Sequence, residues 1–445
     1  MFTKLQTSIA SQNIWRIRRV SHSFFPALRL QFYKLRHLHL SPAVQMIDHL
    51  QYNIGVPAEE LAKYCPGGYH PVHLGDVLDK GRYKILDKLG FGSFSTVWLA
   101  RDEVNNINVS IKIVVAEMSD RQNRELDILQ SIKLNGDPNH PGQKHVSHLL
   151  DSFYHEGPNG RHLCVVLELL GPKISSVADR RPNYRLEGKL ARQISSQLLL
   201  AVDYLRSCGV AHGDIHMGNV LFRISRSDNT PTVANSRVGK VSKKDGSPSE
   251  KGVPEYLVEP VEYRFDKDEL LDEVQLVDFG ESFFISNPPK SVYTPMSLHP
   301  PELVFKHPLT EAIDIWNLGC TTYELVTGRT PFEAGMDDHE LIPQFQKVLG
   351  GVPEQWIQDA LKAGVLKEEP DASVAKNFLP LEEDIRASYA NGYDKETLDL
   401  DEEDLTKLGS YLRRMCIVEP TRRANSTELM SHPWIQVDKR IHNGE

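Results

Sequence analysis

The most informative segment of the chain is Val210-Ala-His-Gly-Asp-Ile-His-Met-Gly-Asn-Val-Leu-Phe222. It follows residues 189–206, whose amphipathic periodicity predicts a helix that ends near Gly209. Asp214 and Asn219 therefore lie on one loop, five positions apart. Phosphoryl transfer needs an acid that orients the incoming hydroxyl group and an amide oxygen that holds a metal ion, and one short turn can supply both. The alternative is a polar loop with a satisfied Asx turn.

A second segment, Leu276-Val-Asp-Phe-Gly280, is an apolar run that ends in a carboxylate followed by a glycine. This pattern predicts a strand with Asp278 at its end. A carboxylate in that place suits a magnesium ion that contacts the β- and γ-phosphate oxygens of a nucleotide. Taken with the loop, it predicts ATP and Mg²⁺ as cofactors, with Asn219 and Asp278 as the metal ligands.

A glycine-bearing turn, Leu89-Gly-Phe-Gly-Ser-Phe-Ser-Thr-Val97, joins two predicted strands. Small residues such as Gly90 and Gly92 let backbone N–H groups approach phosphates. The strand–turn–strand context disfavours a Rossmann motif, which needs a helix directly after its glycines. A hairpin without a ligand is the alternative, because Ser95 replaces the third glycine.

Lys112 lies on the next predicted strand, within the run Val-Ser-Ile-Lys. From there its ammonium group can bridge two phosphates. Glu125, in the helix predicted for residues 121–132, can pair with this lysine and hold it in place. Asp127 is the competing acid, but the apolar register of the helix favours Glu125.

The order of elements predicts an α+β chain in two lobes. Short β-branched runs between residues 83 and 115 predict an antiparallel sheet, and helical periods dominate after residue 171. The lobes meet near residues 168–172, and a ligand-binding cleft is expected between them. We divide the chain into a basic arm (1–47), a lead-in segment (48–82), an N-terminal lobe (83–170), a C-terminal lobe (171–435) and a tail (436–445). Within the C-terminal lobe, the polar composition of residues 225–252 predicts a flexible insert that extends to about residue 273.

The composition of the 445 residues is that of a globular protein, with 40% hydrophobic and 25% charged residues. The net charge of −9 argues against a nucleic-acid binder. No stretch is apolar for long enough to span a membrane. The five cysteines are far apart in the chain, without the spacing of a metal site or of a disulfide framework. We therefore expect the protein to be in a reducing compartment.

The basic arm departs from this acidic average, because it has no acidic residue before Asp48. Its arginine and serine content is typical of a mitochondrial transit peptide. The alternatives are a disordered basic arm or a start codon upstream of the true one.

Between Tyr83 and Trp434 the chain resembles the eukaryotic protein kinases. Pro300-Pro-Glu302 resembles the end of their activation segment, Asp314 begins a run that resembles their buried central helix, and Arg423 lies in a segment like their late arginine motif. The resemblance implies an ion pair between Glu302 and Arg423. It also implies that Asp314 braces the loop around Asp214.

Three features resemble the SR-protein kinase family, which phosphorylates serines in Arg/Ser-rich segments: the lead-in sequence 64–76, the glycine loop, and the long insert between Asn219 and Asp278. The resemblance implies an ATP-dependent serine/threonine kinase of basic protein substrates, SR-type splicing factors among them. It further implies a monomer in the cytoplasm and nucleus, without direct contact to nucleic acid.

Carried over residue by residue, the resemblance makes Asp214 the catalytic base, and Lys112 with Glu125 the phosphate-positioning pair. The implied nucleotide-binding set is Leu89, Gly90, Gly92, Val97, Lys112, Leu221 and the backbones of Glu168 and Leu170.

Two departures from the family pattern lie beside Asp214. Gly213 stands where the family has an arginine, which removes the receiver for an activation-segment phosphate. His216 stands where the family has a lysine. We expect a neighbouring triphosphate to raise the pKa of His216, so that it supplies the positive charge as a catalytic residue.

The segment expected to lie beside the phosphoacceptor also differs from the pattern of related families, because Leu298-His299 stands where they have Tyr-Arg. The acidic groove expected for an arginine-rich peptide is only partly present: Asp337, Asp338 and Glu340 are followed by Gln344 and Lys347.

Two other functions stay open. One is a kinase of small molecules, since aminoglycoside and choline kinases have a similar loop; the other is a pseudokinase that binds without catalysis.

Overall fold

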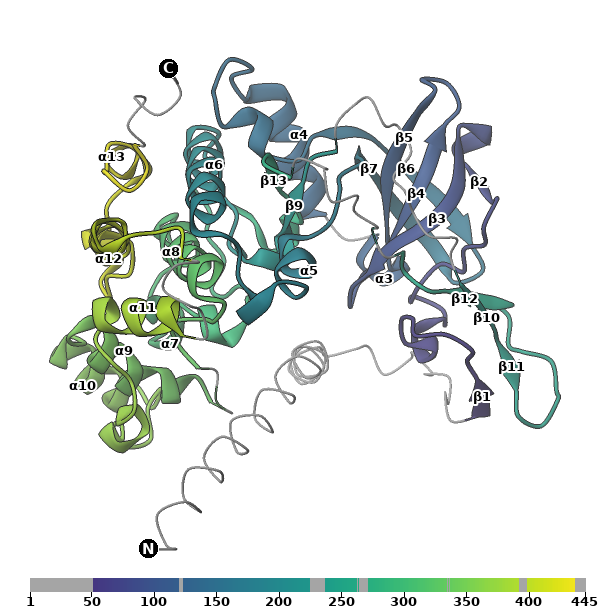
Figure 1. Cartoon of the computed structure of the whole chain (residues 1–445). Coiled ribbons are helices and arrows are strands. Elements are labelled where there is room, and N and C mark those ends of the chain that lie inside the picture. The colour runs from purple at the N-terminus through teal and green to yellow at the C-terminus, as the bar shows by residue number, and fades with distance from the viewer. Residues whose placement is uncertain are drawn as a thin grey trace, which may run out of the picture.

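The computed structural model describes residues 51–119, 123–224, 237–261, 263, 271–333, 335, 337–391 and 398–436. The basic arm, and with it the expected transit peptide, lies outside these residues, as does the tail beyond Gln436. Figure 1 shows a strand-rich lobe beside a helical lobe, which confirms the predicted α+β architecture.

The N-terminal lobe is built on a six-stranded antiparallel sheet with the order β2-β3-β4-β5-β7-β6. Its strands are β2 (Val77–Leu78), β3 (Tyr83–Phe91), β4 (Ser95–Asp102), β5 (Ile107–Val114), β6 (Leu149–Gly157) and β7 (Gly160–Glu168). Val109, Ile111 and Ile113 of β5 are buried in the core on one face of the sheet. Because side chains alternate along a strand, Lys112 faces the opposite side, where helix α4 (Arg124–Asn135) lies.

The C-terminal lobe is organised around helices α6 (Gly188–Ser207) and α8 (Ala312–Thr327), which pack together in its core. Around them lie α5 (Ile174–Ala178), α7 (Pro301–Val304), α9 (Leu341–Leu349), α10 (Glu354–Lys362), α11 (Leu381–Ala390), α12 (Glu402–Met415) and α13 (Ser426–Met430). Two short antiparallel pairs complete the lobe: β8 (Val210–Ala211) with β14 (Phe283–Phe284), and β9 (Val220–Phe222) with β13 (Val274–Leu276). These pairs place residues 212–219 and residue 278 next to each other on the side of the lobe that faces Lys112.

The prediction that residues 225–252 form a flexible insert is wrong for the part that the structure describes. Strand β10 (Val238–Lys240) pairs with β12 (Tyr256–Val258), and β11 (Ser242–Lys243) pairs with β1 (Tyr52–Asn53) of the lead-in segment. Val241 and Leu257 are buried in a cluster with lead-in side chains such as Leu61. The insert is poor in apolar residues by itself, and the distant lead-in segment supplies the rest of its core. Residues 225–236 lie outside the described part of the chain.

Among the described residues, no helix is both long and apolar enough to cross a bilayer.

The ion pair between Arg423 and Glu302 is fully buried and bidentate, with N–O distances of 2.7 and 2.6 Å. Replacing Glu302 with leucine leaves a buried guanidinium group without its counter-charge. We expect this change to lower the free energy of unfolding by about 3–5 kcal/mol, measured by urea denaturation. The neighbouring pair Arg422–Glu419 is a matched control, because both side chains are partly exposed. Glu419→Leu should cost less than about 1 kcal/mol, and equal losses in the two variants would contradict the prediction.

Candidate active site

A lysine shared by two carboxylates forms the centre of the site. The Nζ atom of Lys112 lies 2.7 Å from Oε1 and 2.9 Å from Oε2 of Glu125, and 2.9 Å from Oδ1 of Asp278. Glu125 lies in the first turn of α4, where the side chain of Asn123 caps the helix. The structure therefore brings together three residues that the sequence separates by up to 166 positions.

Asp278 carries both electrostatic and backbone constraints. The ammonium group of Lys112 holds the pKa of Asp278 well below its usual range, so its carboxylate stays ionised. Its backbone is left-handed, with φ of 66°, a conformation that costs a residue with a Cβ about 1–2 kcal/mol. The strained backbone presents the carboxylate at the end of β13, where it accepts the Gly280 N–H.

One buried carboxylate fixes the backbone at the start of the loop that contains Asp214 and Asn219. Asp314 of α8 accepts the backbone N–H groups of His212, at 2.7 Å, and of Gly213, at 2.8 Å. Burial raises the pKa of Asp314 to about 7, against the effect of these two hydrogen bonds. The loop thus has the support from Asp314 that the family resemblance implied.

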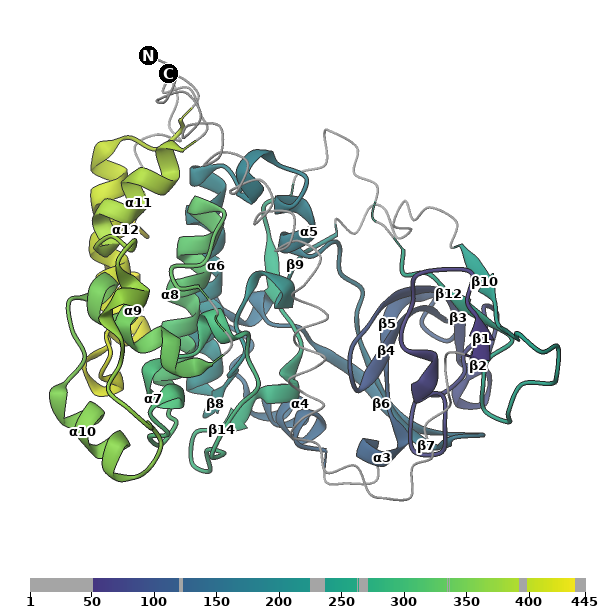
Figure 2. The same ribbon diagram turned by 90° about the horizontal axis from the view of Figure 1, so that it is seen from below.

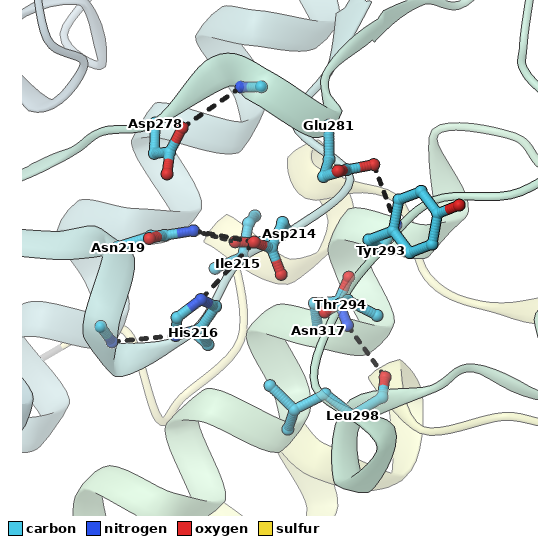
Figure 3. Close-up of polar contacts among 12 residues, drawn as sticks. Asp214, Ile215, His216, Asn219, Asp278, Glu281, Tyr293, Thr294, Leu298 and Asn317 are labelled. Atoms are coloured by element: carbon cyan, nitrogen blue, oxygen red, sulfur yellow. Dashed lines mark hydrogen bonds and ion pairs between the residues drawn. The ribbon is translucent and has the colours of Figure 1, made fainter. Parts of the chain in front are cut away.

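Asp214 and Asn219 contact each other across the loop (Figure 3). The amide nitrogen of Asn219 donates to the carbonyl and to Oδ2 of Asp214, both at 3.0 Å. The amide oxygen of Asn219 therefore points away from Asp214. That oxygen and the half-exposed carboxylate of Asp278 are hard oxygen ligands of the kind that a divalent cation takes alongside phosphate oxygens and water. The residues thus fit a nucleotide-bound divalent ion, whose chemistry would be to neutralise phosphate charge.

His216 forms an ion pair with Asp214. Its Nε2 atom lies 3.5 Å from Oδ2 of Asp214. Burial lowers the pKa of His216, but the Asp214 carboxylate and Glu324 raise it above the ordinary value. For Asp214, burial raises the pKa, but the interactions with His216 and other neighbours lower it by more. The pKa of Asp214 is therefore below its usual range. The sequence predicts the raised pKa of His216, but Asp214 already provides it without any nucleotide.

The backbone explains why residue 213 is a glycine. Gly213 has a φ of 79°, and a Cβ there would lie 2.9 Å from the carbonyl oxygen of Glu281. Glu281 follows Asp278 in the chain, and its carboxylate accepts the N–H of Tyr293 at 2.9 Å. A larger residue at 213 would therefore push against the segment that carries Asp278.

The other residues expected to bind the nucleotide lie on strands β3, β4 and β9 and at the lobe junction. Leu89 and Gly90 are in β3, Gly92 follows it, and Val97 of β4 is paired with Lys112. Leu221 of β9 is paired with Gln275. At the lobe junction, the Glu168 side chain is held by His148, at 2.9 Å, and by Gln275, at 3.1 Å.

Two contacts at the site were missed from the sequence. The hydroxyl group of Tyr263 donates to the Leu170 carbonyl at 2.6 Å, so the insert reaches the lobe junction. Glu324 of α8 lies within electrostatic reach of His216. Neither residue belongs to a local motif, and only the tertiary fold brings them to the site.

The expected acidic groove is largely engaged in internal contacts. Asp338 lies 2.9 Å from Nδ1 of His299, whose Nε2 is 3.0 Å from the Thr294 carbonyl. Gln344 is buried and bonds to the backbone of Glu333 and Glu340, so it does not line a groove. His299 therefore attaches the activation segment to the segment before α9.

Residues 83–242 and 263–435 match the family model of the protein kinase domain. The chain belongs to the protein kinase family. The kinase is 42% identical to protein kinase dsk1 of Schizosaccharomyces pombe over 171 residues, which are 38% of this chain and 31% of dsk1. It is 35% identical to SRSF protein kinase 3 of Homo sapiens, over 41% of this chain and 32% of that protein. These alignments thus span less than half of either relative.

A longer alignment joins the kinase to serine/threonine-protein kinase SRPK of Physarum polycephalum, with 29% identity over 403 residues, 84% of this chain and 90% of that protein. Among solved structures, a crystallised kinase domain superposes with a TM-score of 0.60 at 19% identity, covering 82% of this chain and 98% of that one. At this identity the likeness concerns the fold.

The His216–Asp214 pair predicts an unusual pH profile. Because the pKa of His216 is raised, the imidazolium persists below that raised pKa and is lost as the pH rises through it. We expect kcat to fall on this alkaline side, and His216→Lys to abolish the fall up to about pH 9. A neutral His216→Gln variant should be slow at every pH. Superimposable wild-type and His216→Lys profiles would refute the charge role.

Gly213→Ala tests the backbone argument. We expect it to lower the free energy of unfolding by about 2–3 kcal/mol, because left-handed strain adds to the contact with Glu281. The matched control is Gly209→Ala, which has a φ of 71° but open space around the new Cβ. Gly209→Ala should cost about 1–2 kcal/mol and keep full activity, whereas Gly213→Ala should also lose activity. Identical costs and activities would remove the steric explanation.

Proposed function

We propose that this kinase transfers the γ-phosphate of ATP, with Mg²⁺ as its divalent cation, to serine or threonine residues of basic, arginine-rich proteins, SR-type splicing factors among them. The observation that carries the proposal is the contact of Lys112 with both Glu125 and Asp278, beside the hydrogen-bonded pair of Asp214 and Asn219. In phosphoryl transfer this arrangement positions phosphates, metal and hydroxyl group together. The names of the relatives, SRPK and SRSF protein kinase 3, support the choice of substrate class.

In the mechanism we propose, Asp214 receives the hydroxyl proton of the substrate. Its low pKa keeps it ionised, and the Asn219 amide fixes one of its oxygens, while Oδ1 has no hydrogen-bond partner among the described residues. Lys112 orients the phosphates, and its own position depends on Glu125. His216 supplies positive charge beside the transferring phosphoryl group, in place of the usual lysine.

An acidic group near the reacting residues supports a basic substrate. Burial raises the pKa of Glu324 to about 7, while His216 lowers it, so the side chain carries most of its charge at pH 8. A guanidinium group of the substrate would form a charge-assisted hydrogen bond with this carboxylate, which burial has deprived of water. Glu324 therefore offers the recognition that Asp338 cannot, since Asp338 is paired with His299.

Peptide assays test the substrate class. At pH 8 the full chain should phosphorylate serine in an Arg-Ser repeat peptide and act poorly on an Ala-Ser repeat. Glu324→Gln should raise KM for the Arg-Ser peptide by about tenfold, as expected for the loss of one charge-assisted contact. Because Glu324 also raises the pKa of His216, kcat at pH 8 should fall as well, and by the same factor for both peptides. Glu354→Gln, on the exposed surface of α10, is the matched control and should change neither constant.

An Asp214→Asn chain serves as the inactive reference in these assays. If the wild-type chain binds ATP but transfers no phosphate to any protein, the pseudokinase alternative holds. If it phosphorylates hydroxylated metabolites in preference to both peptides, the small-molecule alternative holds.

We further propose that the kinase acts in the cytoplasm and nucleus. Imaging the full chain beside a chain that lacks residues 1–47 tests this placement. A mitochondrial signal that disappears on deletion would instead support import through the basic arm.

A further inference from the structure

The lead-in segment contacts the tip of the glycine loop directly. The hydroxyl group of Tyr69 donates to the Gly92 carbonyl at 2.6 Å, with the Ser93 carbonyl at 3.4 Å. The ammonium group of Lys63 lies 3.5 Å from the same Ser93 carbonyl. Both carbonyls belong to the turn that is expected to cover the nucleotide phosphates.

Tyr69 is rigidly placed for this contact. It is 2% exposed, and its backbone carbonyl accepts a 2.7 Å hydrogen bond from the buried side chain of Asn159. Asn159 also donates to the carbonyl of Gly252 in the insert, at 2.9 Å. Burial raises the pKa of the Tyr69 hydroxyl, so it stays protonated and remains a donor.

Side chains from the lead-in segment, the end of β5 and the insert pack around Tyr69 in one buried cluster. The buried cluster around it contains Tyr64 of the lead-in, Val115 after β5 and Leu257 of the insert, and Phe94 of the glycine loop packs against it. A buried ion pair between Lys88 of β3 and Glu59 ties the lead-in to the first strand of the hairpin. Figure 2 shows the lead-in and β10–β12 together at the outer side of the sheet.

The hydrogen bond from Tyr69 to the Gly92 carbonyl also determines where the next backbone N–H group points. In each unit the C=O and the following N–H point in opposite directions. Because the Gly92 carbonyl points at Tyr69, the N–H of Ser93 in the same unit points away from the lead-in segment. Fixing the carbonyl therefore fixes the direction of an amide that can donate to a phosphate oxygen.

We propose that Tyr69 is a positioning residue for phosphate binding: its hydroxyl group holds the Gly92–Ser93 peptide unit so that the loop amides face the phosphates of ATP. The lead-in segment thereby sets the affinity of the kinase for the phosphate part of its nucleotide. The adenine part binds at the lobe junction and is independent of this contact.

Tyr69→Phe removes only the hydroxyl group and can be tested on the full chain by calorimetric titration with ATP, ADP and adenosine. We expect the Kd for ATP and ADP to rise about three- to tenfold, the usual effect of losing one hydrogen bond, and the Kd for adenosine to stay within about twofold. Tyr83→Phe is the matched control, because Tyr83 is a fully buried tyrosine of the same lobe whose hydroxyl bonds to Asp151 instead. It should leave all three affinities unchanged.

Lys63→Gln provides a second variant at a partly exposed position and should weaken ATP binding by about twofold. The proposal is overturned if Tyr69→Phe binds ATP like the wild type, or if it loses ATP and adenosine equally, which would indicate general damage to the lobe. If Tyr69→Phe does not fold, unchanged ATP affinity in Lys63→Gln overturns it. These titrations need no protein substrate, so their failure is distinct from failure of the proposed substrate class.

Discussion

The ammonium group of Lys112 lies between two carboxylates, Glu125 of helix α4 and Asp278 after strand β13. One ammonium group thus faces two carboxyl groups where the two lobes meet. The pairing connects a strand and a helix of one lobe to the segment of the other lobe that follows strand β13. It also leaves surplus negative charge at Asp278, which favours a divalent cation and the phosphates that accompany it. The loop with Asp214 and Asn219, the proposed metal ligands and the sheet are arranged around this single contact.

The fold and the central chemistry could be predicted because their signals are local. The strand containing Lys112 and the loop containing Asp214 and Asn219 each carry their periodicity or spacing within a few residues. The contacts of Tyr69, Tyr263 and Glu324 could not be predicted, since each joins segments that are far apart in the chain.

Two errors of interpretation have the same origin. The insert was expected to be flexible, but its strands complete their core with residues of the lead-in segment, such as Tyr52. Asp338 was expected to line an acidic groove for the substrate, yet its carboxylate is paired with His299 of the preceding segment. Composition and position describe what a residue is able to do, and the partner that tertiary structure supplies decides what it does.

Strand β1 precedes the two regions that match the protein kinase domain, residues 83–242 and 263–435, and its partner β11 lies at the end of the first region, at residues 242 and 243. Each strand is only two residues long and has no other partner in its sheet, so neither can exist without the other. The lead-in segment and the insert are therefore one structural unit, whose two parts are separated in the chain by residues 83–224. Their lengths and apolar residues are expected to change together during evolution, and an exchange of either segment between related kinases would have to carry the other with it.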